Sequence, residues 1–491
     1  MCNPRMTGTK YNPVTPAIVE ELRRIVGPRY VIFGDADALE PYSHDEIPDR
    51  RYAHMPEVVV RPRSADEIAA IMTLANRELI PVTPRGAGSG LSGGAVPVRG
   101  GIVLLVDRMN AIMEVDESNL MAVVEPGVVT ADINEVLAPK GLFYAGYPMS
   151  RETCYIGGNV AENAAGPHTL AYGVTTNHVL GLEVVLPGGE VIHTGAPFWD
   201  RPGYDLRGLL VGSEGTLGIV TEVTVRLCRK PEAVVTLLSI YERVVDATRT
   251  VAAITARGIT PSALEMMDGF TLRAVEEATH AGYPMDSAAV LLIEVEGLRE
   301  AVEEQADQIA QVCRENQARE VHRAQTTEER ELLWRGRKNA FGALGRISPS
   351  YYLQDGVIPR TRLPEMLEYI AQVARKYDLL IGNIFHAGDG NLHPIIMFDP
   401  RDAGQAQRVR QAAKEILSQC VAMGGAITGE HGVGLEKRDL MPLTFSDDDL
   451  EMMRRLKSVF DPQGHFNPGK LLPPGRERGE LRVQVSTGGI A

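Results

Sequence analysis

The stretch Pro81-Val-Thr-Pro-Arg-Gly-Ala-Gly-Ser-Gly-Leu-Ser-Gly-Gly-Ala-Val96 determines how the rest of this sequence is interpreted. Five of its residues are glycine, and small residues fill most of the positions between them. Glycine adopts positive φ angles at low steric cost, so successive N–H groups can converge on one anion such as a phosphate. A strand pattern precedes the glycines, and another, Gly101–Val106, follows them. The pattern predicts a pyrophosphate-binding loop within a folded domain.

Other interpretations of this stretch fit less well. It lacks the Lys-Ser/Thr ending of a Walker loop. Arg85-Gly-Ala-Gly-Ser-Gly90 contains G-x-G, but it leads into a strand pattern rather than a helix, which argues against a Rossmann fingerprint. A flexible Gly/Ser linker is the remaining alternative, and the arginine and apolar flanks are poor linker composition.

Length and composition limit the kinds of protein that this chain can be. Its 491 residues suggest two to four domains at about 150 residues each. A net charge of −14 argues against nucleic acid or an anionic membrane as a non-specific partner. The sequence shows neither a transmembrane run nor an apolar signal core, so we expect a cytoplasmic protein. Its five cysteines include no C-x-x-C, so an iron–sulfur cluster would have to lie on another polypeptide.

Two further glycine-rich stretches follow the first. Cys154–Gly166 alternates small residues with amides, which suits contact with a polar ring system; a buried helix packed through small residues is the alternative. Leu210–Thr221 leads into a strand pattern over Val223–Leu227. Lys230-Pro231 then marks a plausible domain boundary.

From Val234 onward, strand and helix patterns alternate in a different order. This order predicts an antiparallel sheet covered by helices on one side, an α+β arrangement. The expected strands are Val234–Ile240, Ser262–Met266 and Ala289–Glu296, and the expected helices are Val244–Arg257 and Leu298–Asn316.

Two loops in the C-terminal half carry imidazole and carboxylate groups. His386, His393 and Glu430 together predict a site for zinc, manganese or iron with an open coordination position. His431, beside a ligand, is predicted as the base. Each histidine alone would more often be structural. A hydrolytic zinc site is a competing interpretation, but it lacks H-E-x-x-H and leaves the glycine stretches unexplained.

A basic segment, Trp334-Arg-Gly-Arg-Lys338, lies upstream of these loops. Its arginines offer planar bidentate geometry to a substrate carboxylate. A solvated basic turn of a helix is an equally good interpretation of the segment.

Taken together, these segments resemble a known family. Arg85–Gly94, Ile156–Asn163 and Gly212–Gly218 are similar to the FAD-binding segments of the vanillyl-alcohol-oxidase/PCMH flavoproteins. Phe385–His393 and Gly429–Gly432 are similar to the D-2-hydroxy-acid dehydrogenase branch, and above all to the FAD-binding subunits of bacterial glycolate oxidases. The resemblance spans about residues 15–473. It includes Leu264-Glu-Met-Met-Asp268, Gly345-Arg-Ile-Ser-Pro349 and Asn467-Pro-Gly-Lys470.

The resemblance implies an α+β fold: a PCMH-type FAD-binding domain of two α/β subdomains, an inserted α+β cap domain with an antiparallel sheet, and C-terminal helices that return to the FAD domain. The expected divisions are an N-terminal helical segment at 1–52, the FAD-binding domain at 53–231, the substrate or cap domain at 232–425, a C-terminal helical segment with the Glu-His motif at 426–473, and a flexible tail at 474–491.

The resemblance also implies roles for particular residues. His386, His393 and Glu430 would bind a divalent metal, His431 would remove the hydroxyl proton, Arg337 would grip the substrate carboxylate, and Asn391 would complete the catalytic set. The first glycine loop has Ser89 and no histidine, so the FAD is expected to be non-covalent. The implied cofactor-binding residues are Arg85, Gly86, Ala87, Gly88, Ser89, Gly90, Pro148, Gly157, Gly158, Asn159, Glu162, Asn163, Gly166, Glu214, Gly215, Gly218 and Ile219.

The implied reaction is the oxidation of a small 2-hydroxy acid, glycolate or D-lactate, to the 2-keto acid, with hydride passing to flavin N5. The implied partners are a second flavoprotein subunit and an iron–sulfur subunit, which would pass electrons towards quinone and provide the only contact with the inner face of the membrane. A D-lactate or D-2-hydroxyglutarate dehydrogenase with another acceptor, or a non-catalytic flavin scaffold, are the alternatives. Leu353 and Gln354 are uncharged where a dicarboxylate would need a cation, which favours a monocarboxylate.

Overall fold

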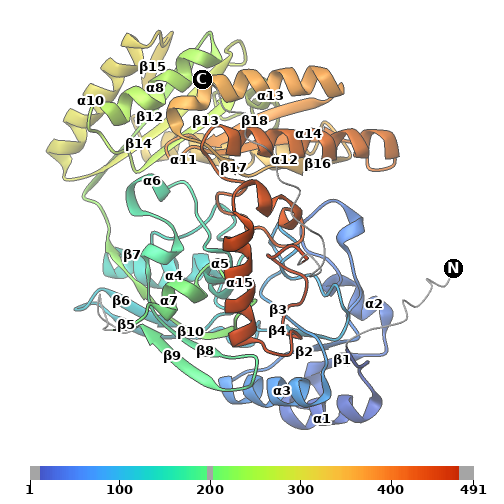
Figure 1. Cartoon of the computed structure of the whole chain (residues 1–491). Helices are drawn as coiled ribbons and strands as arrows, with labels where there is room; N and C mark the ends of the chain where they lie inside the picture. The colour runs from blue at the N-terminus through green and yellow to red at the C-terminus, as the bar shows by residue number, and fades with distance from the viewer. Residues whose placement is uncertain (1–10, 196–202, 475–491) are drawn as a thin grey trace, which may run out of the picture.

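The computed structural model describes residues 11–195 and 203–474. The tail expected over 474–491 lies outside these residues except for its first position. Figure 1 shows two layers: the N-terminal half and the last helix form the lower one, and residues from Ala233 to about 426 form the upper one. Within the described ranges, no helix is long and apolar enough to cross a membrane.

A four-stranded sheet in the order β1-β2-β4-β3 positions the first glycine loop. Both β2 and β3 run parallel to β4, as expected when helix α3 connects β2 to β3. The side chain of Ser64 caps α3 by accepting from the N–H of Glu67 at 3.2 Å. The bounds are β1 Val31–Phe33, β2 Val58–Val60, α3 Ala65–Glu78, β3 Val82–Arg85 and β4 Ile102–Leu105, with α1 Pro16–Val26 and α2 Ala36–Leu39 beside them.

A five-stranded antiparallel sheet in the order β5-β6-β10-β8-β9 completes the lower layer. Strand β10 alternates buried and half-buried residues, because Val223 and Val225 on one of its faces pack against helices of this layer. The strands are β5 Ile112–Asp116, β6 Met121–Val124, β8 Val179–Val185, β9 Val191–Gly195 and β10 Ile219–Arg226, and a small pair joins β7 Leu142–Phe143 to β11 Cys228–Arg229. The helices are α4 Thr130–Leu137, α5 Ile156–Glu162, α6 Thr169–Tyr172 and α7 Leu206–Leu210.

The upper layer is one antiparallel sheet in the order β15-β12-β14-β13-β18-β19-β16, with β17 paired to β19. The predicted antiparallel pairing is therefore correct. The bounds are β12 Ala233–Tyr241, β13 Ala263–Asp268, β14 Ala289–Gly297, β15 Glu320–Arg323, β16 Ser350–Leu353, β17 Gly356–Val357, β18 Leu380–His386 and β19 Asn391–Phe398.

The expectation of helices on one side of this sheet is wrong, because helices cover both faces. Leu237 and Leu291 face a core that includes α8, α10, α13 and α14, whereas Leu238 and Leu292 face another that includes α9, α11 and α12. The helices are α8 Val244–Ala256, α9 Gly269–Thr279, α10 Arg299–Glu315, α11 Thr327–Lys338, α12 Ala340–Leu344, α13 Leu363–Tyr377 and α14 Ala403–Ala422.

The chain returns from the upper to the lower layer after α14. Helix α15 (Asp447–Phe460) lies in the lower layer (Figure 1). Beyond it, the N–H of Val82 donates to the carbonyl of His465 at 2.9 Å, and the N–H of Asn467 donates to the carbonyl of Val82 at 2.7 Å. These bonds tie the C-terminal segment to the strand that leads into the first glycine loop. The Glu-His loop, residues 427–434, therefore lies where the two layers meet.

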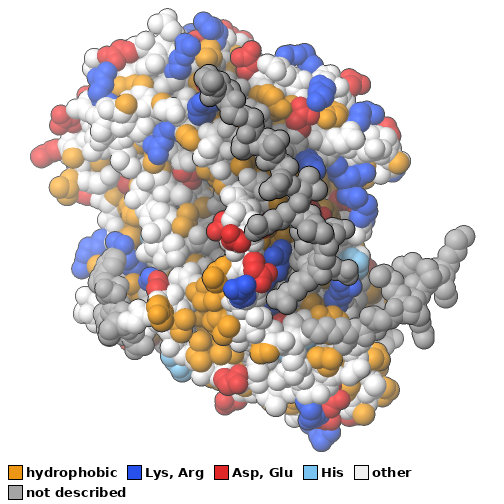
Figure 2. Space-filling model, in the orientation of Figure 1, with side chains coloured by type: hydrophobic (Ala, Val, Ile, Leu, Met, Phe, Trp, Pro, Cys, Tyr) orange, Lys and Arg blue, Asp and Glu red, His pale blue; other side chains and the backbone are white. Residues whose placement is uncertain are grey.

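The outer surface of the upper layer carries charges of both signs. Figure 2 shows Lys and Arg side chains interspersed with Asp and Glu side chains over this layer, on the face in view. In the same layer, Arg323 of β15 pairs with Glu303 of α10. Opposite charges placed side by side largely cancel at a distance, so this face has no strong field of one sign.

Candidate functional site

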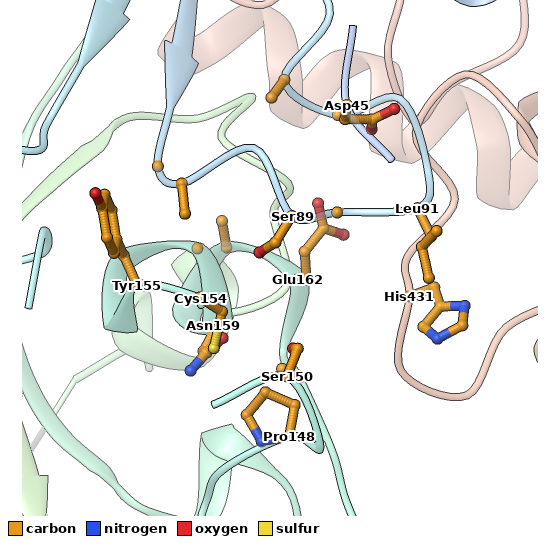
Figure 3. A pocket seen from close by; sticks show the side chains of 18 of the residues that line it. Asp45, Ser89, Leu91, Pro148, Ser150, Cys154, Tyr155, Asn159, Glu162 and His431 are labelled. Carbon is orange, nitrogen blue, oxygen red and sulfur yellow. The ribbon is translucent and has the colours of Figure 1, made fainter. Parts of the chain in front are cut away.

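A cavity of about 660 Å³ lies between the two layers. The first glycine loop and helix α5 form one side of it, and Figure 3 shows Ser89, Asn159, Glu162 and His431 around the space. Twenty of the 23 predicted site residues line it, which brings the glycine stretches together with the histidine motifs. Asn163, Gly166 and Asn391 are the predicted residues that do not line it. These twenty are Arg85, Gly86, Ala87, Gly88, Ser89, Gly90, Pro148, Gly157, Gly158, Asn159, Glu162, Glu214, Gly215, Gly218, Ile219, Arg337, His386, His393, Glu430 and His431.

The first glycine loop is held from behind by Arg85. Its guanidinium donates to the carbonyl of His44 at 2.8 Å and to that of Pro41 at 3.2 Å. Gly88 has φ +78°, and a Cβ there would lie 2.1 Å from Nη2 of Arg85. The loop therefore needs glycine at position 88 and leaves its backbone open to the cavity, as a phosphate-binding loop requires.

The second glycine stretch is a small-residue helix with one side against the protein and the other on the cavity. A Cβ on Gly157 would lie 2.6 Å from Cβ of Pro126, whereas a Cβ on Gly158 would meet nothing within 4 Å. Asn159 donates to Oγ1 of Thr130 at 2.7 Å, which fixes the helix to α4. The predicted packing through small residues is confirmed at Gly157, and Gly158 leaves open the side on which contact with a polar ring system is predicted.

The two motif histidines project from neighbouring strands, at the end of β18 and within β19. The register pairs His386 with Asn391 and Ile384 with His393, so both imidazoles lie on the same face, and their ring centroids are 5.2 Å apart. Oε1 of Glu430 lies 3.4 Å from Nε2 of His386 and 3.0 Å from Nε2 of His393. The three donor atoms all lie within 4.8 Å of one another.

The other nitrogen of each imidazole is occupied. Nδ1 of His386 lies 2.8 Å from Oε1 of Glu265, and Nδ1 of His393 lies 3.1 Å from the carbonyl of Gln354. Protein metal ligands commonly have this arrangement, in which an outer acceptor fixes the tautomer and turns the second nitrogen towards the ion. The donor atoms of this cluster could therefore hold a divalent cation.

The charges of the cluster are strongly coupled. Burial opposes the charged imidazole, but Glu265 and Glu430 outweigh it and raise the pKa of His386 to about 10. Burial alone would raise the pKa of Glu430, but hydrogen bonds with His386 and His393 lower it. A cation, whether a proton or a metal ion, is thus strongly favoured between these groups.

His431 has the opposite electrostatic environment. Burial disfavours its imidazolium and lowers its pKa to about 4. Its ring stacks on that of His393, with centroids 5.2 Å apart and planes 14° apart. His431 is therefore neutral at neutral pH and able to accept a proton.

Asp355, which has no predicted role, holds the Glu-His loop in place. Its carboxylate accepts from the N–H groups of Gly429, Glu430 and His431 at 3.1, 3.1 and 3.0 Å. It also accepts from Nζ of Lys437 at 3.0 Å and from Nδ2 of Asn391 at 2.8 Å. Burial works against this charge, but Lys437 and the neighbouring histidines hold the pKa of Asp355 well below its usual value. Asn391 thus supports the loop from behind, outside the lining of the cavity.

Arg337 and its partner Glu265 are both almost completely buried. Nη2 of Arg337 lies 2.6 Å from Oε2 of Glu265, and each side chain is 1% exposed. None of the three guanidinium nitrogens of Arg337 makes a hydrogen bond of good geometry within the described chain. Arg337 lines the cavity, so these buried donors are available to an anion. In the sequence, the one feature that could have indicated Glu265 as a site residue is its place in the Leu264-Glu-Met-Met-Asp268 motif.

Glu214 links the third glycine stretch to the Glu-His loop. Its two carboxylate oxygens accept from the N–H groups of Val433 and Gly434 at 2.7 and 2.6 Å. Glu162 approaches the same loop: a Cβ on Gly432, which has φ +84°, would lie 1.9 Å from its Oε2. The loop that carries the predicted base is therefore fixed to both layers.

Comparison with known proteins agrees with this geometry. Residues 56–195 match the FAD binding domain, and residues 230–471 match the C-terminal domain of FAD linked oxidases. The chain is 42% identical to glycolate oxidase subunit GlcD of Escherichia coli (strain K12), over 96% of this chain and 93% of that protein. It is 43% identical to GlcD of Bacillus subtilis (strain 168), over 93% and 97%. It is 33% identical to D-lactate dehydrogenase of Anaerostipes hadrus, over 95% and 99%.

Solved structures with little sequence identity share the fold. Substrate-bound p-cresol methylhydroxylase superimposes with a TM-score of 0.79 at 19% identity, over 92% of this chain and 96% of that one. The isoeugenol complex of 4-ethylphenol oxidase from Gulosibacter chungangensis gives 0.75 at 20% identity, with the same coverage. The predicted α+β class with a PCMH-type FAD-binding fold is confirmed. The chain belongs to the family of FAD-linked oxidases that includes glycolate oxidase subunit GlcD and D-lactate dehydrogenase.

Proposed function

We propose that this chain uses FAD to oxidise a small 2-hydroxy monocarboxylic acid, glycolate or D-lactate, to the corresponding 2-keto acid. One observation carries the proposal: a single cavity joins the glycine stretches of the FAD binding domain to Arg337, the His386–His393–Glu430 cluster and His431. The names of the relatives, glycolate oxidase and D-lactate dehydrogenase, support the same class of substrate.

The cavity fits FAD and a divalent metal. Its volume of about 660 Å³, the backbone of residues 86–90 and the open side of Gly158 suit a dinucleotide, and Ser89 in place of a histidine supports non-covalent attachment. FAD, when bound, supplies the acceptor for the two electrons and the hydrogen of the α-carbon. His386, His393 and Glu430 would hold a zinc, manganese or iron ion, which would act as a Lewis acid.

The residues of the chain bind the substrate and move its proton. Arg337 would bind the carboxylate through its free guanidinium donors. His431, neutral and buried, would accept the hydroxyl proton. Leu353 and Phe341 contribute apolar side chains to the lining of the cavity. Leu353 is uncharged, but Lys338 also lines the cavity, so the choice of glycolate or D-lactate over D-2-hydroxyglutarate rests on the names of the relatives.

We further propose that the electrons leave through partner subunits. Both GlcD relatives are named as subunits, which implies that they function within larger assemblies. The cysteine spacing of this chain offers no cluster motif, so a second flavoprotein and an iron–sulfur subunit would complete the transfer. A D-lactate dehydrogenase with a different acceptor would use the same cavity.

The test is an anaerobic absorbance titration of the purified FAD-loaded protein. Glycolate, D-lactate, L-lactate and D-2-hydroxyglutarate are added separately, and bleaching of the flavin band is followed. We expect glycolate or D-lactate to bleach the band and D-2-hydroxyglutarate to leave it unchanged at equal concentration. A flavin that none of these acids reduces would refute the proposed activity. Failure to bind FAD would refute the assignment of the cavity.

A further inference from the structure

We propose that Glu265 is a positioning residue that serves the metal cluster and the substrate-binding arginine at once, so that both affinities depend on one side chain. The inference rests on the proposed function and adds to it. It assigns a role to a residue that neither touches the reacting atoms nor belongs to the predicted ligand set.

The two oxygens of Glu265 have different partners. Strand β13 pairs with β18 in a register that places Glu265 opposite His386. Oε1 lies 2.8 Å from Nδ1 of His386, while Oε2 lies 2.6 Å from Nη2 of Arg337 on helix α11. All three side chains are at most 5% exposed. Because both contacts are sheltered from water, neither can be replaced by solvent at low cost.

The contact to His386 determines which nitrogen faces the cluster. A carboxylate at Nδ1 requires a proton there, which leaves the lone pair on Nε2 for the ion beside Glu430. Without Glu265, the imidazole could rotate or carry its proton on Nε2. Metal affinity should therefore fall even though every metal ligand is unchanged.

The contact to Arg337 is an ion pair by distance, but its angles are not those of a hydrogen bond. Glu265 therefore holds the guanidinium in place by charge while leaving its N–H groups available to a second anion. Removing that charge would leave a buried arginine unpaired, and the side chain would move or take another partner. Carboxylate affinity should therefore fall even in the absence of metal.

The experiment measures the two affinities separately in Glu265→Gln and wild-type protein, both loaded with FAD. Mn²⁺ binding to protein stripped with EDTA is followed by the loss of the free-ion electron paramagnetic resonance signal, with no carboxylate present. Pyruvate binding is followed by the shift of the oxidised flavin spectrum, with EDTA present. We expect Glu265→Gln to weaken both affinities at least tenfold. Loss of only one affinity, or of neither, would overturn the proposal.

The control is Glu294→Gln. Glu294 is also a buried carboxylate on the sheet, paired to an arginine of the same helix: its Oε2 lies 2.8 Å from Nε of Arg330. It does not line the cavity, so its variant should bind Mn²⁺ and pyruvate within threefold of wild type. A control that weakened both affinities equally would show that general loosening of the sheet explains the result, and would overturn the proposal.

A second variant covers the case in which Glu265→Gln does not bind FAD, and the wild-type titration distinguishes an error about Glu265 from an error about the proposed function. If Glu265→Gln loses FAD, Glu265→Asp serves instead, because shortening the side chain withdraws the charge from both partners, and the same two losses are expected. If wild type is bleached by glycolate or D-lactate while both affinities survive in the variants, the role of Glu265 is wrong and the proposed function stands. If wild type is not bleached by any of the acids, it is the proposed function that fails.

Discussion

The carboxylate of Asp355 lies directly behind His431, whose backbone N–H donates to its Oδ2 at 3.0 Å. The imidazole is held less directly, with Nδ1 3.9 Å from the same oxygen. The position of the proposed base is therefore set through its backbone. Nε2 likewise lies 3.9 Å from Oε1 of Glu430, so both nitrogens are beyond hydrogen-bond distance of these carboxylates. The ring is therefore able to accept a proton.

Substituting Asp355→Asn tests this support. The amide retains the shape of the side chain but removes the charge that pairs with Lys437 and faces three N–H groups, so the loop should shift. We expect reduction by hydroxy acid to slow at least 100-fold while the flavin spectrum is retained, with a loss of about 3 kcal/mol in the free energy of unfolding. Stopped-flow absorbance and chemical denaturation measure the two effects.

The matched control for Asp355 is Asp268→Asn. Asp268 is half-buried, and it caps helix α9 by accepting from the N–H of Thr271 at 2.9 Å, away from the cavity. Because asparagine caps a helix about as well as aspartate, this variant should lose less than about 1 kcal/mol of stability and keep its reduction rate. If Asp355→Asn were also reduced at the wild-type rate, the loop would not depend on Asp355.

Replacing His431 with alanine tests its role as the base. The imidazole lines the cavity, and the backbone N–H that anchors the loop is kept in alanine, so the protein should keep its yellow spectrum and its stability. Loss of a general base slows proton transfer by about 100-fold or more, and bleaching by glycolate or D-lactate should slow accordingly. A variant reduced at the normal rate would refute this assignment.

Substituting Gly432 with alanine tests how closely the Glu-His loop packs against Glu162 on the FAD side of the cavity. In Gly432→Ala, the new Cβ would meet Oε2 of Glu162 at 1.9 Å. Gly34, with φ +79° and nothing within 4 Å, carries the same backbone strain without the contact. Alanine at position 34 should cost about 1 kcal/mol, and at position 432 about 1–3 kcal/mol more.

Denaturation of the two glycine variants measures their stability, and flavin bleaching measures the displacement of His431. Only Gly432→Ala should slow the reduction. If the two variants had equal free energies of unfolding and equal rates of flavin reduction, the side chain of Glu162 would have moved aside and left the loop in place.

The buried imidazole of His178 should make the free energy of unfolding depend on pH. It is 1% exposed, and burial, with a contribution from Arg226, lowers its pKa to about 4. Its unfolded value is about 6.5, so between these values the unfolded chain binds more protons and the free energy of unfolding rises with pH. The stabilisation is complete above about pH 6.5 and is lost as the pH falls towards about 4. The shift corresponds to about 3 kcal/mol.

His178→Leu should remove this component, and the unfolding free energy measured by denaturant between pH 4.5 and 7.5 should depend less steeply on pH. His193→Gln, at a side chain that is 69% exposed, is the control and should leave the slope unchanged. An unchanged slope in His178→Leu would show that another group causes the pH dependence.

The parts of the site that the sequence predicted are those that local spacing defines. Gly86 to Gly90, Gly157 and Gly158 come together in the structure as expected, because each segment carries its own conformational requirement. The pair His386 and His393 is also local, since one hairpin places both side chains on the same face.

The parts that the sequence did not predict depend on register between distant strands. Glu265 meets His386 across 121 residues, and Asp355 meets His431 across 76. No periodicity within either segment shows which strand will lie beside it. The sequence does contain a pattern that indicates helices on both faces of the upper sheet. The apolar run Val290–Ile293 does not alternate with polar residues, and such runs are typical of strands that are buried on both faces.

Glu214 binds the N–H of Val433, a partner 219 residues later in the chain. Contacts at such separation form late during folding, because the entropy of closing the intervening loop must be overcome first. Each sheet consists of strands of one layer only, whereas the Glu-His loop is held by Glu214 of the lower layer and Asp355 of the upper layer. We therefore expect chemical competence to appear only after both layers have formed, so that a partly folded chain would lack the arrangement proposed to oxidise hydroxy acids.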